Sequence, residues 1–310
     1  MITSVRRTAA VCVLGAALAA CGASGTPQRT AAPSAPYPAA VPRTATLAPG
    51  PGGLTPVFTN APRLGKTVAL TFDADMTADQ GPRAAAGEHF DNPGLIGALR
   101  ALRVPATVFM TGRWAEQYPD EARAIAADPL FEVGNHSYSH YSFTPSCYGL
   151  PVLPRQRMRS DVERAFTALR AAGVTHPMPY FRFPGGCYDD QALRAIGALG
   201  VTAVQWDVVS GDAFATHADA VAQQVLDGVR PGSVVVLHCT RSAAPVTEDA
   251  VRTVVPELRE QGYRFVKVSA LIEASHERRQ KGGRGGNGNG DGDGDGDGGT
   301  GPARRPTPGS

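Results

Sequence analysis

The chain has 310 residues, enough for one large domain or two small ones with a sizeable core. Lys and Arg number 30 against 28 Asp and Glu, and the resulting net charge of +2 points to no polyanionic partner. The sequence carries no basic stripe interleaved with aromatic residues, which argues against nucleic acid as a partner.

The N-terminus predicts export. MITSVRR supplies a positively charged start, and the apolar run that follows is too short for an ordinary membrane span, so residues 1–20 are predicted to be a signal peptide. The residues LAAC, ending at Cys21, resemble the lipobox of bacterial lipoproteins. That resemblance implies cleavage before Cys21, its acylation, and a lipid anchor on the outer face of the cytoplasmic membrane. A plain secretory signal, with an incidental Cys21, is the alternative.

Two biased segments flank a central region. Residues 21–62 are rich in Ala, Pro, Thr and Ser without hydrophobic periodicity, which predicts an extended linker. Residues 277–310 are Gly- and Asp-rich and are predicted to be a disordered tail. Their DGDGDGDG run lacks the terminal Glu and the flanking helices of an EF-hand calcium loop. One folded domain is therefore expected, over residues 63–276.

Short apolar runs alternate with helical patterns through this domain. β-Branched and aromatic residues predict strands at 66–72, 106–110, 131–135, 179–183, 201–206, 233–238 and 263–268. Helical spacing of apolar residues predicts helices at 92–102, 118–128, 155–173, 189–200, 217–229 and 247–262. Repeated βα units predict an α/β fold with a parallel sheet, and about seven of them favour a closed or nearly closed barrel.

Polar clusters follow five of the predicted strands. They are Asp-Ala-Asp at 73–75, Asn-His-Ser-Tyr-Ser-His at 135–140, Arg182, Trp-Asp at 206–207 and His-Cys at 238–239. In parallel α/β folds the ligand site forms at the carboxyl ends of the strands. The five clusters are therefore expected to share one rim.

Two histidines and two acids in these clusters suggest metal chemistry. If their loop is helical, His136 and His140 share a face, and such a pair can supply two ligands to a divalent metal such as zinc. A lone pair with this spacing is more often structural. In an extended segment, however, Asp73 and Asp75 project to the same side. Either acid could complete the ligand set, leaving the other to accept a proton from an activated water.

His238 ends the strand at 233–238 and has two possible roles. It could be an ordinary rim histidine, or as imidazolium it could protonate a departing amine or alkoxide. Asp212 could hold that imidazole in its charged form, and Arg182 could fix the carboxylate that serves as base. Each of these last two residues could instead form a surface ion pair.

The order of five segments carries a family resemblance. TFDAD, HSYSH, RFPGG, WDVVSGDAF and VVVLH resemble the five-motif signature of the polysaccharide deacetylases, the NodB-like carbohydrate esterases of family four. The similarity covers roughly residues 64–273. It implies a single-domain, distorted (β/α)7-type barrel that removes N-acetyl groups from N-acetylhexosamine polymers. It also implies a divalent metal, commonly zinc, held by one Asp and two His.

Carried over to this chain, the resemblance implies Asp73 as the catalytic base and His238 as the acid. It further implies that Asp75, His136 and His140 bind the metal, that Arg182 orients Asp73 and that Leu237 lines an acetyl pocket. Asp212 joins the expected catalytic residues as the partner of His238.

Three positions depart from the usual motifs. Ala74 stands where a second adjacent Asp is common, and because some branches use Asp-x-Asp, we assign Asp75 to the metal. The fourth motif has Ala after its Asp in place of Trp, so the aromatic wall is lost or is supplied by Trp206 or Phe214. Phe183 replaces a usual Pro and is expected near the substrate.

Three cysteines follow the lipobox, so at most one intramolecular bridge can form. Cys147 and Cys187 lie in loops just after site motifs, each followed by Tyr, and are expected to pair. Cys239 is expected to be a buried thiol at a strand end, although a zinc ligand or a nucleophile at this position would be the alternative.

These residues together predict a surface-anchored, metal-dependent deacetylase of an N-acetylated peptidoglycan or chitin-like glycan. An O-acetyl ester hydrolase acting on xylan would use the same machinery. A non-catalytic glycan-binding lipoprotein is the third hypothesis. Such a protein would be expected to lack the base or a metal ligand, whereas every candidate is present here.

Overall fold

The computed structural model describes residues 46–284, so the signal peptide, Cys21 and the tail from residue 285 lie outside the described residues. Within this range the strands are β1 Val57–Phe58, β2 Thr67–Ala74, β3 Ala106–Met110, β4 Phe131–Asn135, β5 Tyr180–Phe181, β6 Thr202–Val204, β7 Val208–Val209, β8 Ser233–His238 and β9 Arg264–Phe265.

Helices follow most of these strands. They are α1 Gln80–Ala85, α2 Pro93–Ala101, α3 Gly112–Gln117, α4 Pro119–Ala126, α5 Arg155–Ala171, α6 Asp190–Ile196, α7 Ala218–Gly228, α8 Thr247–Glu260 and α9 Val268–Arg284. Short 3₁₀ turns add η1 Pro51–Gly53, η2 Pro184–Gly186, η3 Gly197–Leu199 and η4 Asp212–Phe214.

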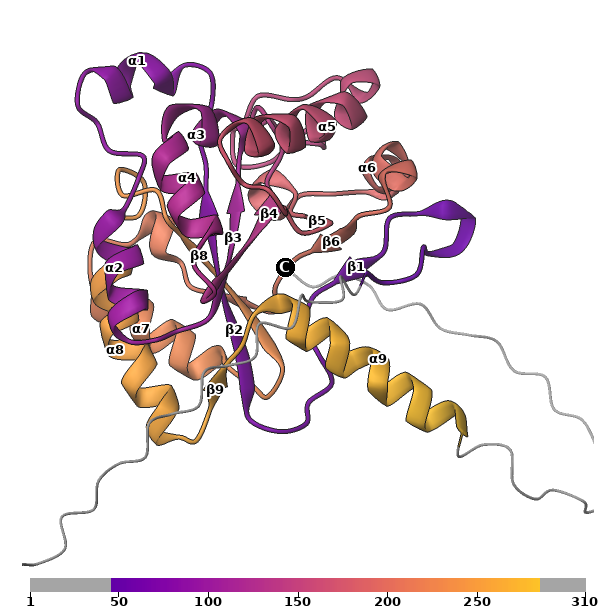
Figure 1. Cartoon of the computed structure of the whole chain (residues 1–310), viewed down its shortest axis with the longest axis vertical. Coiled ribbons are helices and arrows are strands. Elements are labelled where there is room, and N and C mark those ends of the chain that lie inside the picture. Colours follow the sequence, from indigo (N-terminus) through magenta and orange to yellow (C-terminus); the bar gives the residue numbers. More distant parts are fainter. Residues whose placement is uncertain (1–45, 285–310) are drawn as a thin grey trace, which may run out of the picture. The chain divides into compact units, whose positions relative to one another are not determined.

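All strand pairings between these elements are parallel. The order is β1-β6-β5-β4-β3-β2-β8-β7, and β9 pairs with the first residues of β2. The sheet is curled but keeps two free ends, at β1 and β7, so it forms an incomplete barrel of the (β/α)7 type. The predicted α/β fold and single barrel domain are confirmed. Figure 1 shows α2, α7 and α8 on one side of β2 and α9 on the other.

Alternation along β2 divides the core into two layers. Leu70 and Phe72 face outward and pack with buried side chains of α2, α7 and α8. Ala69 faces the barrel interior, where Phe109 and the start of α9 close the core. Because successive side chains of a strand point to opposite faces, Asp73 belongs to the inner face. The long strand therefore carries the first acid into the barrel.

The predicted elements are present, and several others were missed. Each of the seven predicted strands and six predicted helices has a counterpart, whereas β1, β7, α1, α3 and α9 were not predicted. The β1 and β7 strands have only two residues each, too few to show a period in the sequence.

The predicted domain boundaries need correction at both ends. Residues 46–62, expected to belong to the linker, lie against the barrel: β1 pairs with β6, and Phe58 and Ala61 are buried. At the other end α9 continues to Arg284, beyond the predicted limit at residue 276. The N-terminal addition is held by pairing of β1 with β6, whereas the turns of α9 after residue 276 are polar.

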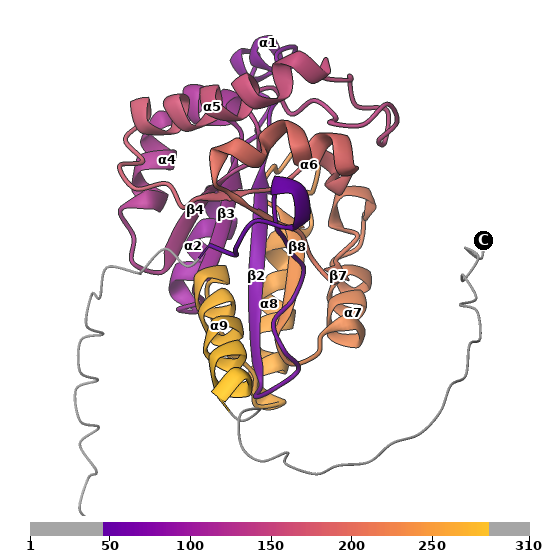
Figure 2. The same cartoon turned by 90° about the vertical axis from the view of Figure 1, so that its right-hand side faces the viewer.

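In the part of the chain that the structure describes, no helix is both long enough and apolar enough to cross a membrane. Figure 2 shows α5 and α6 above the sheet and α9 beside the lower half of β2.

Candidate active site

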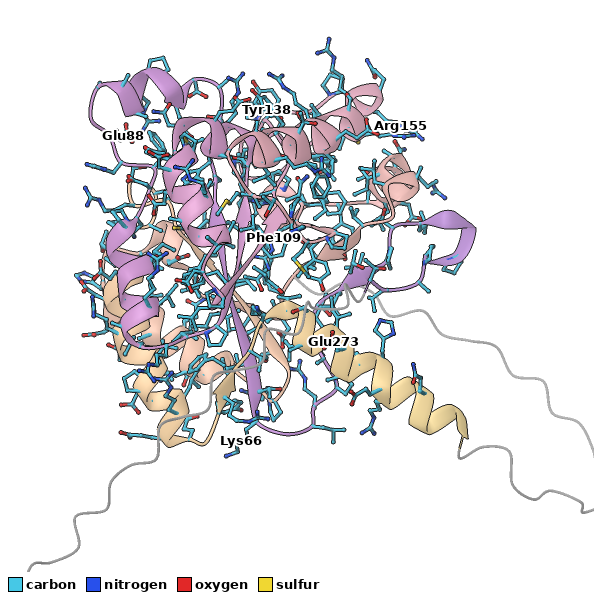
Figure 3. All side chains as sticks on the ribbon, viewed as in Figure 1. Lys66, Glu88, Phe109, Tyr138, Arg155 and Glu273 are labelled. Atoms are coloured by element: carbon cyan, nitrogen blue, oxygen red, sulfur yellow. A yellow bond between two sulfur atoms is a disulfide. The ribbon has the colours of Figure 1, made fainter. Side chains whose placement is uncertain are left out.

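The predicted site residues meet at one end of the sheet. Lys66, directly before β2, lies at the bottom of Figure 3, whereas Tyr138, which follows β4, lies near the top beside α5. The carboxyl ends of the parallel strands therefore point toward α3 and α5. This is the end at which parallel α/β folds place their ligand sites.

Asp73 and His238 face each other across neighbouring strands. They are register partners at the ends of β2 and β8, and both belong to the inner face of the curled sheet. Asp73 is only 4% exposed. An acid and an imidazole thus occupy adjacent positions at the carboxyl ends of β2 and β8.

Arg182 fixes one oxygen of Asp73. Its Nη1 donates to Asp73 Oδ1 at 2.7 Å, its Nε donates to the carbonyl of Val204 at 3.1 Å, and its guanidinium lies 4.1 Å from the centre of the Phe109 ring. Burial would raise the pKa of Asp73, but Arg182 and the imidazoles of His136 and His238 hold it below its usual value. The carboxylate is therefore ionised at neutral pH, with Oδ2 left for chemistry.

His136 and His140 come together through a loop, so the helical arrangement considered for them is wrong. Their ring centroids are 5.0 Å apart. Nδ1 of His136 donates to the carbonyl of Arg182 at 2.9 Å, and its Nε2 lies 3.6 Å from Asp73 Oδ2. His140 Nε2 lies 3.6 Å from Asp75 Oδ2. Each imidazole thus points its Nε2 at one of the two acids.

The loop between the histidines is held by side chains and by an unusual backbone. Ser137 and His140 both have positive φ, +68° and +55°. Asp161 of α5 accepts the backbone N–H of Tyr138 at 2.8 Å, and Asn135 Oδ1 accepts that of Ser137 at 2.8 Å. Non-glycine residues enter this region only where their surroundings compensate for the strain. These contacts define where the two rings lie.

Asp212 surrounds His238 with hydrogen bonds. Its Oδ1 accepts from Nδ1 of His238 at 2.8 Å, and its Oδ2 accepts from the His238 backbone N–H at 2.7 Å. Thr247 and Ser210 also donate to this carboxylate, at 2.7 and 2.9 Å. Burial would lower the pKa of His238, but Asp212, with smaller contributions from Asp75 and Asp73, raises it to about 9. His238 is therefore an imidazolium at neutral pH, and its Nδ1 is occupied.

Sequence reasoning missed one direct partner of the acids. Thr240 Oγ1 donates to the Asp75 carboxylate, and it also accepts the Asp75 backbone N–H at 3.2 Å. A signal was available, because Thr240 follows His238 by two residues, which continues the strand alternation that points His238 inward. Thr247 and Ser210 were missed as well, since neither residue directly follows one of the predicted strands.

The donor set fits a divalent metal in its chemistry. No group of three or more His, Cys, Asp or Glu within residues 46–284 is already arranged as a metal site. However, two imidazole Nε2 atoms each lie 3.6 Å from a carboxylate oxygen. The backbone carbonyl that accepts from His136 Nδ1 fixes the tautomer with an unprotonated Nε2, the usual arrangement of a metal-binding histidine.

Several residues expected near substrate lie elsewhere. Leu237 is 1% exposed and packs under the outer helices, because the register that places His238 beside Asp73 places Leu237 beside Phe72. The expected acetyl-pocket role of Leu237 is therefore corrected. Val236 shares the inner face with His238 by alternation.

The aromatic candidates differ in exposure. Phe183 is completely buried in a cluster with Phe143 and Phe181, so its expected place beside substrate is also corrected. Trp206 is half-buried, with its ring 5.3 Å from the Arg182 guanidinium. Phe214 is 83% exposed at the end of η4. Of the two residues expected to supply an aromatic wall, Trp206 therefore lies against Arg182 and Phe214 faces solvent.

The expected cysteine pair forms a disulfide in the structure. Sγ of Cys147 and Sγ of Cys187 are 2.07 Å apart, linking the loop after β4 to the loop after β5. Cys239 is free and buried, and burial raises the pKa of its thiol. A neutral, buried thiol is a poor metal ligand or nucleophile.

The chain is similar to known deacetylases over most of the described region. The profile of the family described as polysaccharide deacetylase matches residues 60–204. The chain is 30% identical over 203 residues to a chitooligosaccharide deacetylase of Sinorhizobium fredii, covering 66% of this chain and 85% of that protein. It is 29% identical to a peptidoglycan-N-acetylglucosamine deacetylase of Bacillus cereus, covering 68% and 70% of the two chains.

A solved structure extends this similarity to the fold. A family 4 carbohydrate esterase pseudoenzyme from Bacillus anthracis matches with a TM-score of 0.56 and 26% identity, covering 73% of this chain and 70% of that one. The sequence relatives, the arrangement of the sheet and the five rim segments agree: this chain belongs to the polysaccharide deacetylase family.

Proposed function

We propose that this protein is a metal-dependent deacetylase that hydrolyses N-acetyl groups of N-acetylglucosamine-containing glycans, of the peptidoglycan or chitin-like kind. The names of the two sequence relatives support this substrate class. The observation that carries the catalytic proposal is the opposite charge of two strand partners. The pKa of Asp73 is lowered and that of His238 is raised, so neutral pH leaves an anion beside a cation.

Asp73 is proposed as the general base. Arg182 occupies Oδ1, so Oδ2 is the atom that accepts a proton from the attacking water. Because Arg182 is fully buried and its Nε is held by a backbone carbonyl, the guanidinium cannot swing away when the charge on Asp73 changes. The arginine therefore orients the base and is not itself proposed to donate a proton.

His238 is proposed as the general acid. Asp212 occupies Nδ1, so Nε2 is the nitrogen that carries a transferable proton. That proton is delivered to the sugar nitrogen as the carbon–nitrogen bond breaks and acetate leaves. Asp212 then stabilises the histidine until it is protonated again, and its contacts with Thr247 and Ser210 keep the carboxylate in place.

Asp75, His136 and His140 are proposed to hold a divalent metal, with zinc as the first candidate. A metal bound there would act as a Lewis acid on the acetyl carbonyl and would make a water molecule more acidic. Thr240 supports the carboxylate of Asp75, and the Arg182 carbonyl supports the ring of His136. The same arginine thus positions the base through its side chain and a metal ligand through its backbone.

The test is acetate release from N-acetylglucosamine oligomers, together with analysis of bound metal. Asp73→Asn and His238→Gln should each abolish most activity, whereas Asp79→Asn, an exposed acid outside the site, should not. His136→Ala should lose bound metal, whereas His89→Ala, an exposed histidine, should retain it. Full activity in a metal-free preparation would contradict the metal role, and an active Asp73→Asn variant would contradict the base.

Two alternatives use the same barrel. An O-acetyl ester hydrolase would release acetate faster from acetylated xylan than from N-acetylglucosamine oligomers, so the two substrates are compared directly. A non-catalytic glycan-binding protein is the second, because one similar structure is a pseudoenzyme. Binding of oligomers without acetate release, in metal-loaded protein, would favour it.

We further propose that the protein is exported and attached to the outer face of the bacterial cytoplasmic membrane through acylated Cys21. The support is the LAAC sequence directly after a short apolar run. Labelling cells with a radioactive fatty acid should mark the parent chain and not a Cys21→Ala variant. Label that persists in the variant would contradict the anchor.

A further inference from the structure

Exposed apolar side chains gather near the site. Among the residues that the structure describes, six large hydrophobic side chains are exposed. Leu64 lies just before β2, at the end of the sheet away from the site. The other five lie in, or at the carboxyl end of, segments that lead from β4, β5 and β7: Tyr148, Val152, Tyr188, Val209 and Phe214. Exposed apolar surface concentrated in this way indicates a binding surface.

Two aromatic rings dominate this surface. Tyr148 and Phe214 are 77% and 83% exposed, and their ring centroids lie 6.4 Å apart with an interplanar angle of 38°. They come from different sides of the site: Tyr148 from the loop after the metal-ligand histidines, and Phe214 from η4, which begins with Asp212. We call these two residues the aromatic platform. Tyr148 therefore lies in the segment that follows the proposed metal ligands, and Phe214 lies two residues after Asp212, the partner of the proposed acid.

The Tyr148 side of the platform is anchored covalently. Tyr148 follows Cys147, whose disulfide to Cys187 links this loop to the segment after Arg182. The junction is tight, since a Cβ at Gly185 would lie 2.5 Å from Sγ of Cys147. Tyr148 itself has a φ of +48°. A strained, exposed tyrosine tied to the catalytic segment is poorly explained by packing alone.

The chemistry of the platform matches a sugar ring. One face of a pyranose carries carbon-bound hydrogens, which are apolar, and its edge carries hydroxyls. Tyrosine offers an apolar face and a polar hydroxyl, and it loses little conformational entropy when it binds. A glycan chain whose reacting residue lies between Asp73 and His238 must continue along the rim, because packed side chains fill the interior of the barrel and exclude the neighbouring sugar residues.

We propose that Tyr148 and Phe214 stack on a sugar residue of the glycan beyond the one being deacetylated, and that the Cys147–Cys187 disulfide holds Tyr148 in position to do so. This inference rests on the proposed function for the identity of the glycan. It makes the platform a determinant of chain-length preference, because only a substrate long enough to reach the platform gains from it.

The test compares a disaccharide and a hexasaccharide of β-1,4-linked N-acetylglucosamine. Tyr148→Ala should raise KM for the hexasaccharide about tenfold, equivalent to about 1.4 kcal/mol, and the effect on the disaccharide should be at least fivefold smaller. Tyr148→Trp should recover the hexasaccharide KM. The Cys147→Ser/Cys187→Ser variant should reproduce the Tyr148→Ala effect. Leu64→Ala removes an exposed apolar side chain at the other end of the sheet and is the matched control, expected to leave both KM values unchanged.

Direct binding separates this inference from the proposed function. Calorimetric titration of the hexasaccharide into Asp73→Asn protein, with and without Tyr148→Ala, reports affinity without turnover. A tenfold loss of affinity supports the platform even if the parent protein releases no acetate. Equal KM changes on both substrates, or equal hexasaccharide affinity with and without Tyr148, would overturn the platform while acetate release stands. No hexasaccharide binding by the parent protein, or a parent dimer that Tyr148→Ala dissociates, would also overturn it.

Discussion

Replacing Asp212 by asparagine removes the charge that faces His238 while nearly preserving the size of the side chain. Asp212 contacts both the ring and the backbone of His238, and it is the largest contributor that raises the pKa of this histidine. The variant should therefore lose the acid form of His238 at neutral pH. The proposed mechanism requires that form, so acetate release should fall.

The size of the effect follows from the pKa of His238. It is about 9 in the protein and 6.5 for an unperturbed histidine, a difference of about 3 kcal/mol. Without Asp212, burial lowers the pKa of His238 and is opposed only by the smaller contributions of Asp75 and Asp73, so the value in the variant should fall to near 6.5. At pH 7.5 the protonated fraction would fall from about 97% to about 10%, as these two pKa values give. The expected loss in kcat/KM at pH 7.5 is therefore about tenfold.

The assay is the pH dependence of kcat/KM for acetate release from an N-acetylglucosamine oligomer. In the parent protein, activity should decline as pH rises through about 9, because His238 loses its proton there. In Asp212→Asn the decline should begin near pH 6.5. Thr247→Val removes a 2.7 Å hydrogen bond to Asp212 but leaves the charge, so its decline should stay near 9. An alkaline decline that remains near 9 in Asp212→Asn would refute the reasoning.

Three further predictions concern stability. Arg182→Met removes the guanidinium that is hydrogen-bonded to the buried Asp73 carboxylate and should lower the free energy of unfolding by about 3–5 kcal/mol in denaturant titrations. The Arg182→Met/Asp73→Asn double variant should recover part of that loss, and an undiminished loss would count against the pair. The Cys147→Ser/Cys187→Ser variant removes the disulfide between two cysteines with a sequence separation of 40. It should lower the free energy of unfolding by about 3–4 kcal/mol, measured under non-reducing conditions with Cys239→Ser as the control. His238 has a folded pKa above its unfolded value, so its contribution is complete below about pH 6.5 and is lost as pH rises through about 9. The difference in unfolding free energy between the parent protein and His238→Gln should therefore shrink from pH 6 to pH 10, and a constant difference would contradict this origin.

The long elements of this fold could be predicted because their signals are local. The segments at 67–74 and 233–238 are buried along most of their length, so they appear in the sequence as continuous apolar runs. The strands β1 and β7 have two residues each, and they form only because β6 and β8 offer free edges. No window of sequence carries that information. The missed segment at 46–62 belongs to the same class, since its order comes from contacts with the rest of the barrel.

The candidate site was predictable where strand ends and alternation determine it. Asp73, Arg182 and His238 meet because parallel strands end on one side. The Leu237 assignment failed because it followed a motif, whereas the pairing of Phe72 with Leu237 turns that side chain outward. The loop at 136–140 was beyond prediction in detail: its two positive φ values depend on Asp161, a residue of a later helix. Contacts of this kind appear only after the chain has folded.

The sheet order also bears on when the protein can become active during its synthesis. The central strand β2 is made early, but its neighbour β8 follows much later, so that Thr71 bonds to a residue 164 positions further along the chain. Pairings across such separations form slowly, because a long loop must close first. A nascent chain that ends before His238 has its proposed base and metal ligands but lacks its proposed acid, and β2 has an unpaired edge. Completion of the barrel and assembly of the acid–base pair are thus the same late event.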